Sequence, residues 1–343
     1  MTASTSLSSA EEKFSHTVAS LSVIDRDRRT WLAENPEGKS PGALNQLVPE
    51  ITDIELNNDI ALSEPSDVLH VAAWNLERGR HWREAAQLMR EHPVLQRVDV
   101  LCLSEMDDGM VRAHNEHTTR ELALALDMNY AYGVEFLQLS LGVPAEQAQY
   151  SGDNERGYHG NAILSRFPLQ SVRLLRFPGI KKWYGSFEHR LGGRNALFAD
   201  IQVGPQTVTV ISTHLESGPA DGEKRRQEGQ LILQEIAADG GDRPVILCGD
   251  MNAAPETPVI ENFRQAGLLV DDTNDLSQSS YQEVIDGVIR PGKFHIDYVM
   301  ARGLQVVRDH TPPAVIMAAY PCEPTGEFLS DHAIVAVDLR VSG

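Results

Sequence analysis

Residues 245–256 read VILCGDMNAAPE, a short apolar run followed at once by Gly249, Asp250 and Asn252. An apolar run bounded by turn-forming residues is typical of a buried β-strand that ends at a polar edge. A simple turn would use the same Gly-Asp-Met-Asn letters, because Gly, Asp and Asn favour turn conformations. The meaning of this stretch therefore depends on whether other strands end in the same way.

Several other apolar runs also meet polar side chains that can bind a metal ion. Asn75 closes AAWN, Glu105 closes LCLSE and His214 closes ISTH. Near the C-terminus the order is reversed, because Asp331 and His332 precede the apolar run AIVAVDL. A strand antiparallel to the others would bring its first residues to the edge where the others end. The pattern predicts one polar rim at one end of the sheets.

The spacing of apolar residues predicts the elements that carry this rim. The predicted strands are Val68–Trp74, Val98–Leu103, Asn161–Leu164, Ala196–Val203, Thr207–Ser212, Pro244–Cys248, His295–Met300 and Ala333–Val341. The predicted helices are Trp82–Glu91, Thr118–Leu126 and Glu223–Ala238. Hairpins mixed with helical crossovers are typical of two stacked sheets with helices outside. We therefore predict an α+β fold, a four-layer α/β/β/α sandwich of two mixed, mainly antiparallel sheets.

Residues 67–343 would form this sandwich as the catalytic domain, preceded by an N-terminal extension over residues 1–66. Ser8 to Glu34 has apolar residues at roughly helical spacing after a Ser-Ser-Ala-Glu-Glu opening that resembles an N-cap, which predicts a helix. Asn35 to Pro65 is polar, rich in Pro and without sustained periodicity. That composition predicts an ordered wrap or a linker.

Composition limits the class of substrate. Acidic residues outnumber basic ones by 49 to 30, a formal net charge of −19. Such a chain repels an anionic polymer or an anionic lipid surface unless a local basic patch intervenes. A small phosphorylated substrate is favoured, and DNA or RNA is disfavoured.

Cysteine usage and the lack of apolar leader sequences bear on location. The three cysteines are far apart, and Cys102 and Cys248 lie in apolar runs where buried thiols are expected. The sequence shows neither a secretory signal nor a run of membrane-spanning length. We therefore expect a cytoplasmic protein in a reducing compartment, with its oligomeric state undetermined.

The residue types on the rim match the needs of phosphoester hydrolysis. That reaction requires a divalent cation, a base that activates water and donors around the phosphoryl oxygens. Glu105 and Asp331 with the Asn75 amide form an oxygen-rich set suited to Mg²⁺ or Mn²⁺. Histidines can handle protons and oxyanions.

Seven motifs in succession resemble those of the endonuclease/exonuclease/phosphatase superfamily, a group of metal-dependent hydrolases similar to deoxyribonuclease I. They are WNLERG, SEMD, GNAILSRFP, STHLE, GDMNAAPE, HIDYV and SDHAIV. The resemblance covers roughly Asp67 to Leu339. It implies a phosphoester hydrolase in which Glu105 is the principal metal ligand, with Asn75 and Asp331 nearby, and it leaves open whether one or two ions act.

The resemblance also implies roles for the other rim residues. Asp250 would orient or deprotonate the attacking water, while Asn252 and His214 would contact phosphate oxygens. Asp297 would hold the His332 imidazole in one tautomer, and His332 would contact the scissile phosphate or exchange a proton. A carboxylate that binds one imidazole nitrogen is a recurrent way to fix a tautomer, so we predict a hydrogen bond between Asp297 and His332.

A basic and aromatic segment, Arg173 to Arg194, is an expected substrate-recognition flap, although a solvated hairpin explains it equally well. Substrate contacts are expected from Lys181, Trp183 and Arg194 here and from Asn161 in GNAIL. Gly192-Gly193-Arg194 is expected to form a hairpin turn beside the rim. His114 and His117 lack the spacing of a metal motif and predict only a solvated helix start.

The sequence therefore favours a Mg²⁺- or Mn²⁺-dependent phosphodiesterase or phosphatase that uses direct in-line attack of water. A nuclease of the same superfamily is the first alternative. A lipid phosphodiesterase remains open, and so does a catalytically inactive binding module on the same fold.

Overall fold

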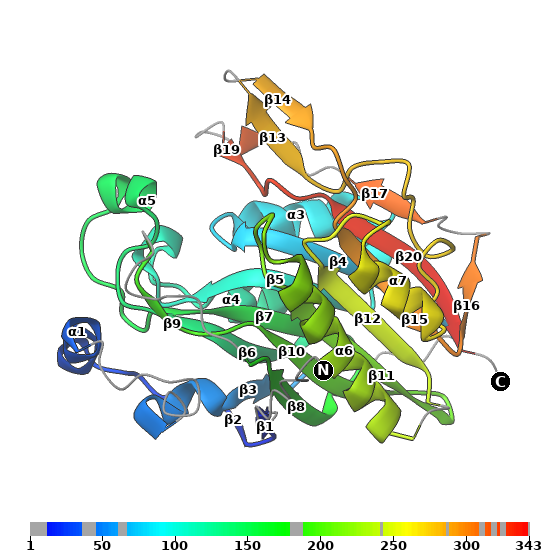
Figure 1. Cartoon of the computed structure of the whole chain (residues 1–343), viewed down its shortest axis with the longest axis horizontal. Helices are drawn as coiled ribbons and strands as arrows, with labels where there is room; N and C mark the ends of the chain where they lie inside the picture. The colour runs from blue at the N-terminus through cyan, green and yellow to red at the C-terminus, as the bar shows by residue number, and fades with distance from the viewer. Residues whose placement is uncertain are drawn as a thin grey trace, which may run out of the picture.

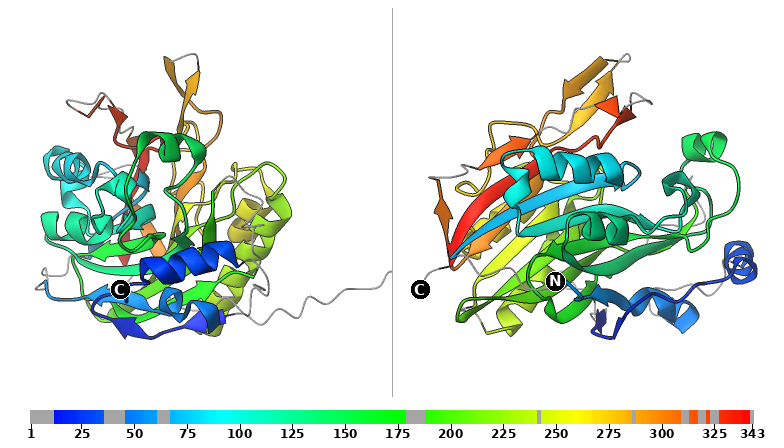
Figure 2. Two further views of the ribbon diagram at one scale, coloured as in Figure 1. Left: turned by 90° about the vertical axis from the view of Figure 1, so that its left-hand side faces the viewer. Right: turned by 180° about the vertical axis from the view of Figure 1, so that it is seen from behind.

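Two β-sheets lie face to face with helices on both outer sides (Figure 1). The computed structural model describes residues 12–35, 46–60, 67–178, 188–240, 243–285, 288–308, 313–316, 321–322 and 327–341. In the left view of Figure 2, α3 (Trp82–Glu91) and α4 (Thr118–Ala125) flank one sheet, and α6 (Gly222–Ala238) and α7 (Pro258–Gln265) flank the other. The predicted four-layer α/β/β/α sandwich is confirmed.

The larger sheet has ten strands within the described residues. Its main order is β16 (Leu304–Val307), β20 (Ile334–Val341), β4 (Val68–Arg78), β5 (Val100–Asp108), β7 (Tyr158–Ser165), β6 (Asn129–Gln138), β3 (Ile54–Asn57) and β2 (Thr17–Val18). β9 (Arg190–Gly192) pairs with β6, and β17 (Ala314–Ile316) pairs with β20. The pairs β4–β5 and β2–β3 are parallel and the others antiparallel.

The smaller sheet has six strands in the described part of the chain. Its order is β1 (Glu12–Phe14), β8 (Gln170–Arg176), β10 (Asn195–Val203), β11 (Gln206–His214), β12 (Val245–Asp250) and β15 (Asp297–Arg302). Only the β11–β12 pair among these is parallel. Two short ribbons, β13 (Gln282–Ile285) with β14 (Val288–Pro291) and β18 (Pro321–Cys322) with β19 (Glu327–Phe328), project beyond the sheets (Figure 1).

Strict alternation along the strands produces the layers, because successive side chains of a strand face opposite ways. On β4, Val71 and Ala73 join the core between the two sheets, while Ala72 and Trp74 join the core beneath α3 and α4. On β12, Ile246 faces the core between the sheets and the neighbouring Leu247 faces α6 and α7. Apolar runs without polar alternation therefore mark strands buried on both faces, as the sequence predicted.

All eight predicted strands and all three predicted helices from residue 67 onward are present, but several strands continue past their predicted ends. β4 runs to Arg78 and β5 to Asp108, so that the polar rim residues are part of the strands. Bulges in both strands make this possible, as described below. Within the part of the chain described, no helix is long and apolar enough to cross a membrane. Cys102 and Cys248 are buried free thiols, as predicted.

The predicted helix from Ser8 to Glu34 is wrong over most of its length. The helix of this segment, α1, spans Arg26–Glu34, capped by the Asp25 side chain, which accepts the Arg28 N–H. Before it, β1 pairs with β8 and β2 pairs with β3, so that this segment supplies strands to both sheets. Pairing with distant strands overrode the helical spacing, which is a weak signal in a mixed polar segment.

The segment from Asn35 to Pro65 is an ordered wrap over its described residues, 46–60. It contains the 3₁₀ helix η1 (Pro49–Thr52) and the strand β3, which pairs with β6. Elsewhere along the chain, the short helices are η2 (Leu95–Arg97), η3 (Val111–Ala113) and α5 (Pro144–Gln149).

Candidate active site

The polar rim predicted from the sequence lies where the ends of both sheets meet. In the smaller sheet, His214 is in register with Asp250, and Asp250 is in register with Asp297. In the larger sheet, β20 is antiparallel to β4, which brings His332, just before β20, close to Asn75. Five residues that lie far apart in the sequence are thus adjacent in space.

The Asp250 carboxylate is the centre of this group. Its Oδ2 atom accepts a hydrogen bond from the Asn75 amide at 3.2 Å and lies 3.3 Å from His214 Nε2 and 3.8 Å from His332 Nε2. Its Oδ1 atom accepts the Asn252 N–H at 2.8 Å. Burial, followed by the Asp297 carboxylate, raises the pKa of Asp250 to about 7. A carboxylate with a pKa near neutrality suits proton transfer from water.

The predicted pair of Asp297 and His332 is confirmed by a hydrogen bond of 2.9 Å between Asp297 Oδ2 and His332 Nδ1. Ser280, which sequence reasoning missed, donates its hydroxyl to the same carboxylate oxygen at 2.7 Å. Burial alone would lower the pKa of His332, but the Asp297 and Asp250 carboxylates raise it well above its ordinary value. Asp250, Asp297 and His332 also place potential ligand atoms within 4.8 Å of one another, but a protonated His332 has no lone pair to offer a metal ion, so this trio suits proton transfer better than metal binding.

Strained backbone shapes the other half of the rim. β4 carries a bulge where Asn75 to Arg78 faces Ser104 to Met106 of β5, and β5 carries one where Leu103 to Met106 faces Gly160 to Ala162 of β7. Within these bulges Glu77, Arg78 and Glu105 adopt positive φ angles of 43°, 72° and 58°. Such conformations are costly for residues other than glycine and are typically retained at functional sites. The bulges turn the Glu77 and Glu105 side chains into the site region.

Three carboxylates gather around this bulge. Burial, followed by the Asp331 and Glu105 carboxylates, raises the pKa of Glu77 to about 7, while Arg80 and Arg78 act in the opposite direction. Arg78 pairs with Glu105 and Arg80 pairs with Glu77, while the Asp331 side chain is 58 % exposed. A concentration of oxygen ligands with excess negative charge fits a hard divalent cation. Sequence reasoning found Glu105 and Asp331 but missed Glu77 and Arg78, although both stand in WNLERG.

Two of the residues expected to bind substrate, Asn161 and Arg194, are buried. Asn161 is fully buried and donates its amide to Glu135 Oε1 and Asn195 Oδ1, both at 3.1 Å. Arg194 is also buried, beneath His214 rather than on the surface of the rim. Gly192–Arg194 is not a hairpin turn, because β9 pairs in the larger sheet and β10 in the smaller one, so that the chain crosses between sheets here. Lys181 and Trp183 lie outside the described residues.

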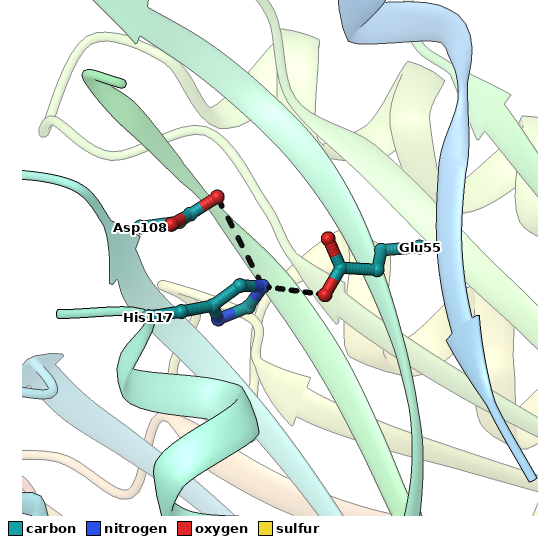
Figure 3. A group of neighbouring side chains, drawn as sticks. All are labelled: Glu55, Asp108 and His117. Atoms are coloured by element: carbon teal, nitrogen blue, oxygen red, sulfur yellow. Dashed lines mark ion pairs between the residues drawn. The ribbon is translucent and has the colours of Figure 1, made fainter. Parts of the chain in front are cut away.

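The solvated helix start expected at His117 is also wrong, because this side chain is 6 % exposed (Figure 3). Its Nε2 atom lies 3.1 Å from Glu55 Oε1 and 3.9 Å from Asp108 Oδ2. Its Nδ1 atom accepts the Arg120 N–H at 3.3 Å, so the proton of the neutral ring lies on Nε2, close to the two carboxylates. A metal ligand would instead present a lone pair there.

The carboxylates of this group also have other partners. Glu55 accepts bonds from Arg120, Tyr130 and the Leu21 N–H, and Asp108 accepts one from Arg156. The group is therefore a buried ion-pair network that ties β3 to β5 and α4, rather than a second metal centre. His114, by contrast, is exposed as expected.

A buried acid behind the rim makes stability depend on pH. Glu228 on α6 is 6 % exposed and accepts the Glu216 N–H at 2.8 Å. Burial, with the neighbouring Glu216 carboxylate, raises its pKa to about 8. The folded state therefore binds the proton more tightly than the unfolded state, and stability is lost as pH rises from about 4.5 to about 8.

We expect Glu228→Gln to be more stable than the natural protein by roughly 2–4 kcal/mol above pH 8, with little difference near pH 4.5. The amide keeps the carbonyl acceptor for the Glu216 N–H and removes the buried charge. Urea unfolding at several pH values measures the difference. Glu223→Gln, an exposed acid of the same helix, is the matched control. A stability difference for Glu228→Gln that does not grow with pH would contradict the argument.

Comparison with known proteins shows the family of this chain. Residues 72–332 match the Endonuclease/Exonuclease/phosphatase family. The chain belongs to that family. The match spans every proposed site residue from Asn75 to His332, and the resemblance inferred from the motifs is confirmed.

The relatives that match this chain by sequence are distant. Protein angel homolog 1 of Homo sapiens is 27% identical over 108 residues, covering 28% of this chain and 16% of that protein. Protein angel homolog 2 of Mus musculus is 24% identical over 199 residues, covering 53% of this chain and 32% of that protein. The chain thus matches about a third or less of the length of these relatives.

Solved structures share the fold at low sequence identity. An endonuclease/exonuclease/phosphatase from Beutenbergia cavernae has a TM-score of 0.57 at 22% identity, covering 80% of this chain and 72% of that chain. The human Nocturnin catalytic domain with bound sulfate also has a TM-score of 0.57, at 17% identity, covering 82% and 98%. TDP2 of D. rerio, complexed with single strand DNA product, has a TM-score of 0.54 at 16% identity, covering 80% and 100%.

Proposed function

We propose that this family member is a phosphoester hydrolase that requires Mg²⁺ or Mn²⁺ and acts on a small phosphorylated substrate. The observation that carries the proposal is the convergence on Asp250 of the Asn75 amide and the His214 and His332 rings, beside a cluster of carboxylates. Glu105 would be the principal ligand of the ion, with Asn75 and Asp331 completing an oxygen-rich set. When bound, the cation would stabilise negative charge on the phosphoryl group.

Side chains of the rim would activate the water, assist the leaving group and contact the phosphoryl oxygens. Asp250 would orient the attacking water and accept its proton, a role that its pKa of about 7 supports. His332, kept cationic by Asp297 and Asp250, would donate a hydrogen bond or a proton on the side of the leaving group. His214 and Asn252 would donate to phosphoryl oxygens. Attack by water would be direct, because the Ser280 hydroxyl is engaged with the Asp297 carboxylate and with two backbone N–H groups.

The pairing of basic residues supports a small substrate over a nucleic acid. Near the rim, Arg78 pairs with Glu105, Arg190 with Glu188 and Arg194 with Glu135. Cations already neutralised by carboxylates contribute little to binding a polyanion, whose affinity comes largely from unpaired Lys and Arg. The excess of acidic residues also weakens the binding of a polyanion.

Salt dependence distinguishes a small substrate from a polynucleotide. We expect kcat/KM for bis-p-nitrophenyl phosphate with Mn²⁺ to change by less than about 3-fold between 50 and 200 mM salt, because few phosphates are neutralised. A polynucleotide held by several cations would lose roughly 10³-fold or more in affinity over that range. Assays of the small ester and of a single-stranded oligonucleotide, with and without chelator, make the comparison. Oligonucleotide cleavage that is faster than ester hydrolysis and falls steeply with salt would instead identify a nuclease.

A binding module without catalysis is the alternative from another class. Stoichiometric binding of Mn²⁺ without turnover of phosphomonoesters, phosphodiesters, phospholipids or oligonucleotides would favour it. The same panel tests a lipid phosphodiesterase, which would prefer the phospholipid arm. Turnover that disappears with chelator and returns with added metal would support the proposed hydrolase.

A further inference from the structure

The Arg194 side chain contacts both a buried acid and a histidine of the candidate active site. It lies in the chain segment that crosses from the larger to the smaller sheet and is 6 % exposed. One nitrogen, Nη1, donates to Glu135 Oε2 at 2.9 Å and contacts His214 Nδ1 at 2.8 Å. Glu135 is fully buried and also accepts the Asn161 amide. The guanidinium is therefore held from behind by Glu135 and directed at one nitrogen of His214.

The chemistry of arginine decides which nitrogen of His214 carries the proton. A guanidinium has donors only and stays protonated in proteins. Because Arg194 can only donate, His214 Nδ1 must accept with its lone pair, and the proton of the neutral ring lies on Nε2. The adjacent positive charge also disfavours a second proton on the ring. Nε2 lies on the site side of the ring, 3.3 Å from Asp250 Oδ2.

We propose that Arg194 is a positioning residue that holds His214 in its Nε2–H tautomer, so that His214 presents a fixed hydrogen-bond donor to the candidate active site. The role of that donor toward a phosphoryl oxygen rests on the proposed function, whereas the tautomer does not. In this assignment His214 is not the base and does not ligate the cation through Nε2. Arg194 would act through His214 and would not contact the substrate, whereas the sequence predicted a direct substrate contact.

The tautomer can be measured without any substrate. In metal-free protein labelled with ¹⁵N in histidine, we expect His214 to show an unprotonated Nδ1 and a protonated Nε2 at neutral pH. Loss of these signals in His214→Asn assigns them. A His214 that carries its proton on Nδ1, or on both nitrogens, overturns the proposal. Because this readout needs neither metal nor turnover, it is unaffected if the chain proves not to be a hydrolase.

A matched pair of variants tests the part played by Arg194. Arg194→Met alone would leave Glu135 buried and unpaired, so the change is made together with Glu135→Gln, and Glu135→Gln alone is the control. We expect the control to keep the single tautomer and the double variant to show a mixture of Nδ1–H and Nε2–H forms. Arg194→Lys, which retains a cationic donor, should restore part of the Nε2–H population. A double variant that keeps the pure Nε2–H tautomer would show that Arg194 does not set it.

Kinetics provide a second readout if the ester is hydrolysed. In metal sites, loss of an outer-shell partner that orients a ligating side chain costs roughly 10–100-fold, and we expect the same scale for a histidine oriented as a donor. We expect a decrease of this size in kcat for the double variant relative to Glu135→Gln, with KM changed less than about 3-fold, because Arg194 does not touch substrate. A large rise in KM at unchanged kcat would indicate direct substrate binding and overturn the positioning role.

Discussion

Asp250→Asn is expected to lower kcat for bis-p-nitrophenyl phosphate by roughly 10²–10⁴-fold, the usual contribution of a general base. The carboxylate would accept the proton of the attacking water, and its Oδ2 atom is also the point toward which Asn75, His214 and His332 converge. An amide of the same shape cannot accept that proton and presents a donor to one of these groups. Steady-state kinetics with saturating Mn²⁺ measures the loss.

The fold should survive this change, because Asn retains a carbonyl oxygen for the Asn252 N–H. We expect the thermal transition of Asp250→Asn to show one cooperative step, as in the natural protein. The matched control is Asp272→Asn, which changes an exposed carboxylate paired with the exposed Arg308. This variant should leave kcat unchanged. Turnover of Asp250→Asn within about 3-fold of the natural rate would remove Asp250 from the role of base.

Removal of residues 1–66 is expected to prevent folding of the remaining chain. This segment supplies β1 to the smaller sheet and β2 and β3 to the larger one. It also buries Leu21, Ile24, Leu32, Val48, Ile51 and Ile54. At roughly 1.5–3 kcal/mol for each buried side chain, their loss is comparable with the whole stability of a typical domain, about 5–15 kcal/mol. Circular dichroism and thermal unfolding of the fragment 67–343 measure the effect.

Single substitutions make the same test without truncation. Ile54→Ala, at a fully buried position on β3, should cost roughly 2–5 kcal/mol. Val23→Ala, at a position 56% exposed, should change stability by less than about 0.5 kcal/mol. A fragment 67–343 that unfolds cooperatively at the natural temperature would instead show that the sandwich is an independent domain, as the sequence boundary at residue 67 suggested.

The sequence predicted the layers and most of the rim because both depend on local patterns. Runs such as VILC mark strands buried on both faces, and a polar residue placed where the run stops must lie at the sheet edge whatever its partners. The Asp297–His332 hydrogen bond was predicted for the same reason, since HIDYV and SDHAIV each place their residue at a strand start. These features need only the order of strands, which seven motifs in sequence constrain strongly.

Other features depend on three-dimensional pairing that no short pattern encodes. Glu77 and Arg78 belong to the rim only because β4 carries a bulge with positive φ angles at residues other than glycine. His117 is buried because Glu55 on β3 packs against it, and β3 itself joins its sheet by pairing with β6. Arg194 is beneath the site because the chain changes sheets there. Helical spacing at residues 8–34 failed for the same reason, because β1 pairs with a strand roughly 160 residues away.

The place of β20 in the larger sheet limits when the candidate active site can form. This last strand of the sheet lies between β16 and β4, and His332 stands two residues before its first residue, Ile334. While the polypeptide is still emerging from a ribosome, β4 therefore lacks a neighbour along one side, and Asp250 has the imidazole of His214 beside it but lacks that of His332. A nascent chain holds Glu105, His214 and Asp250 long before it can hold His332, so the candidate active site is complete only after β20 has been synthesised.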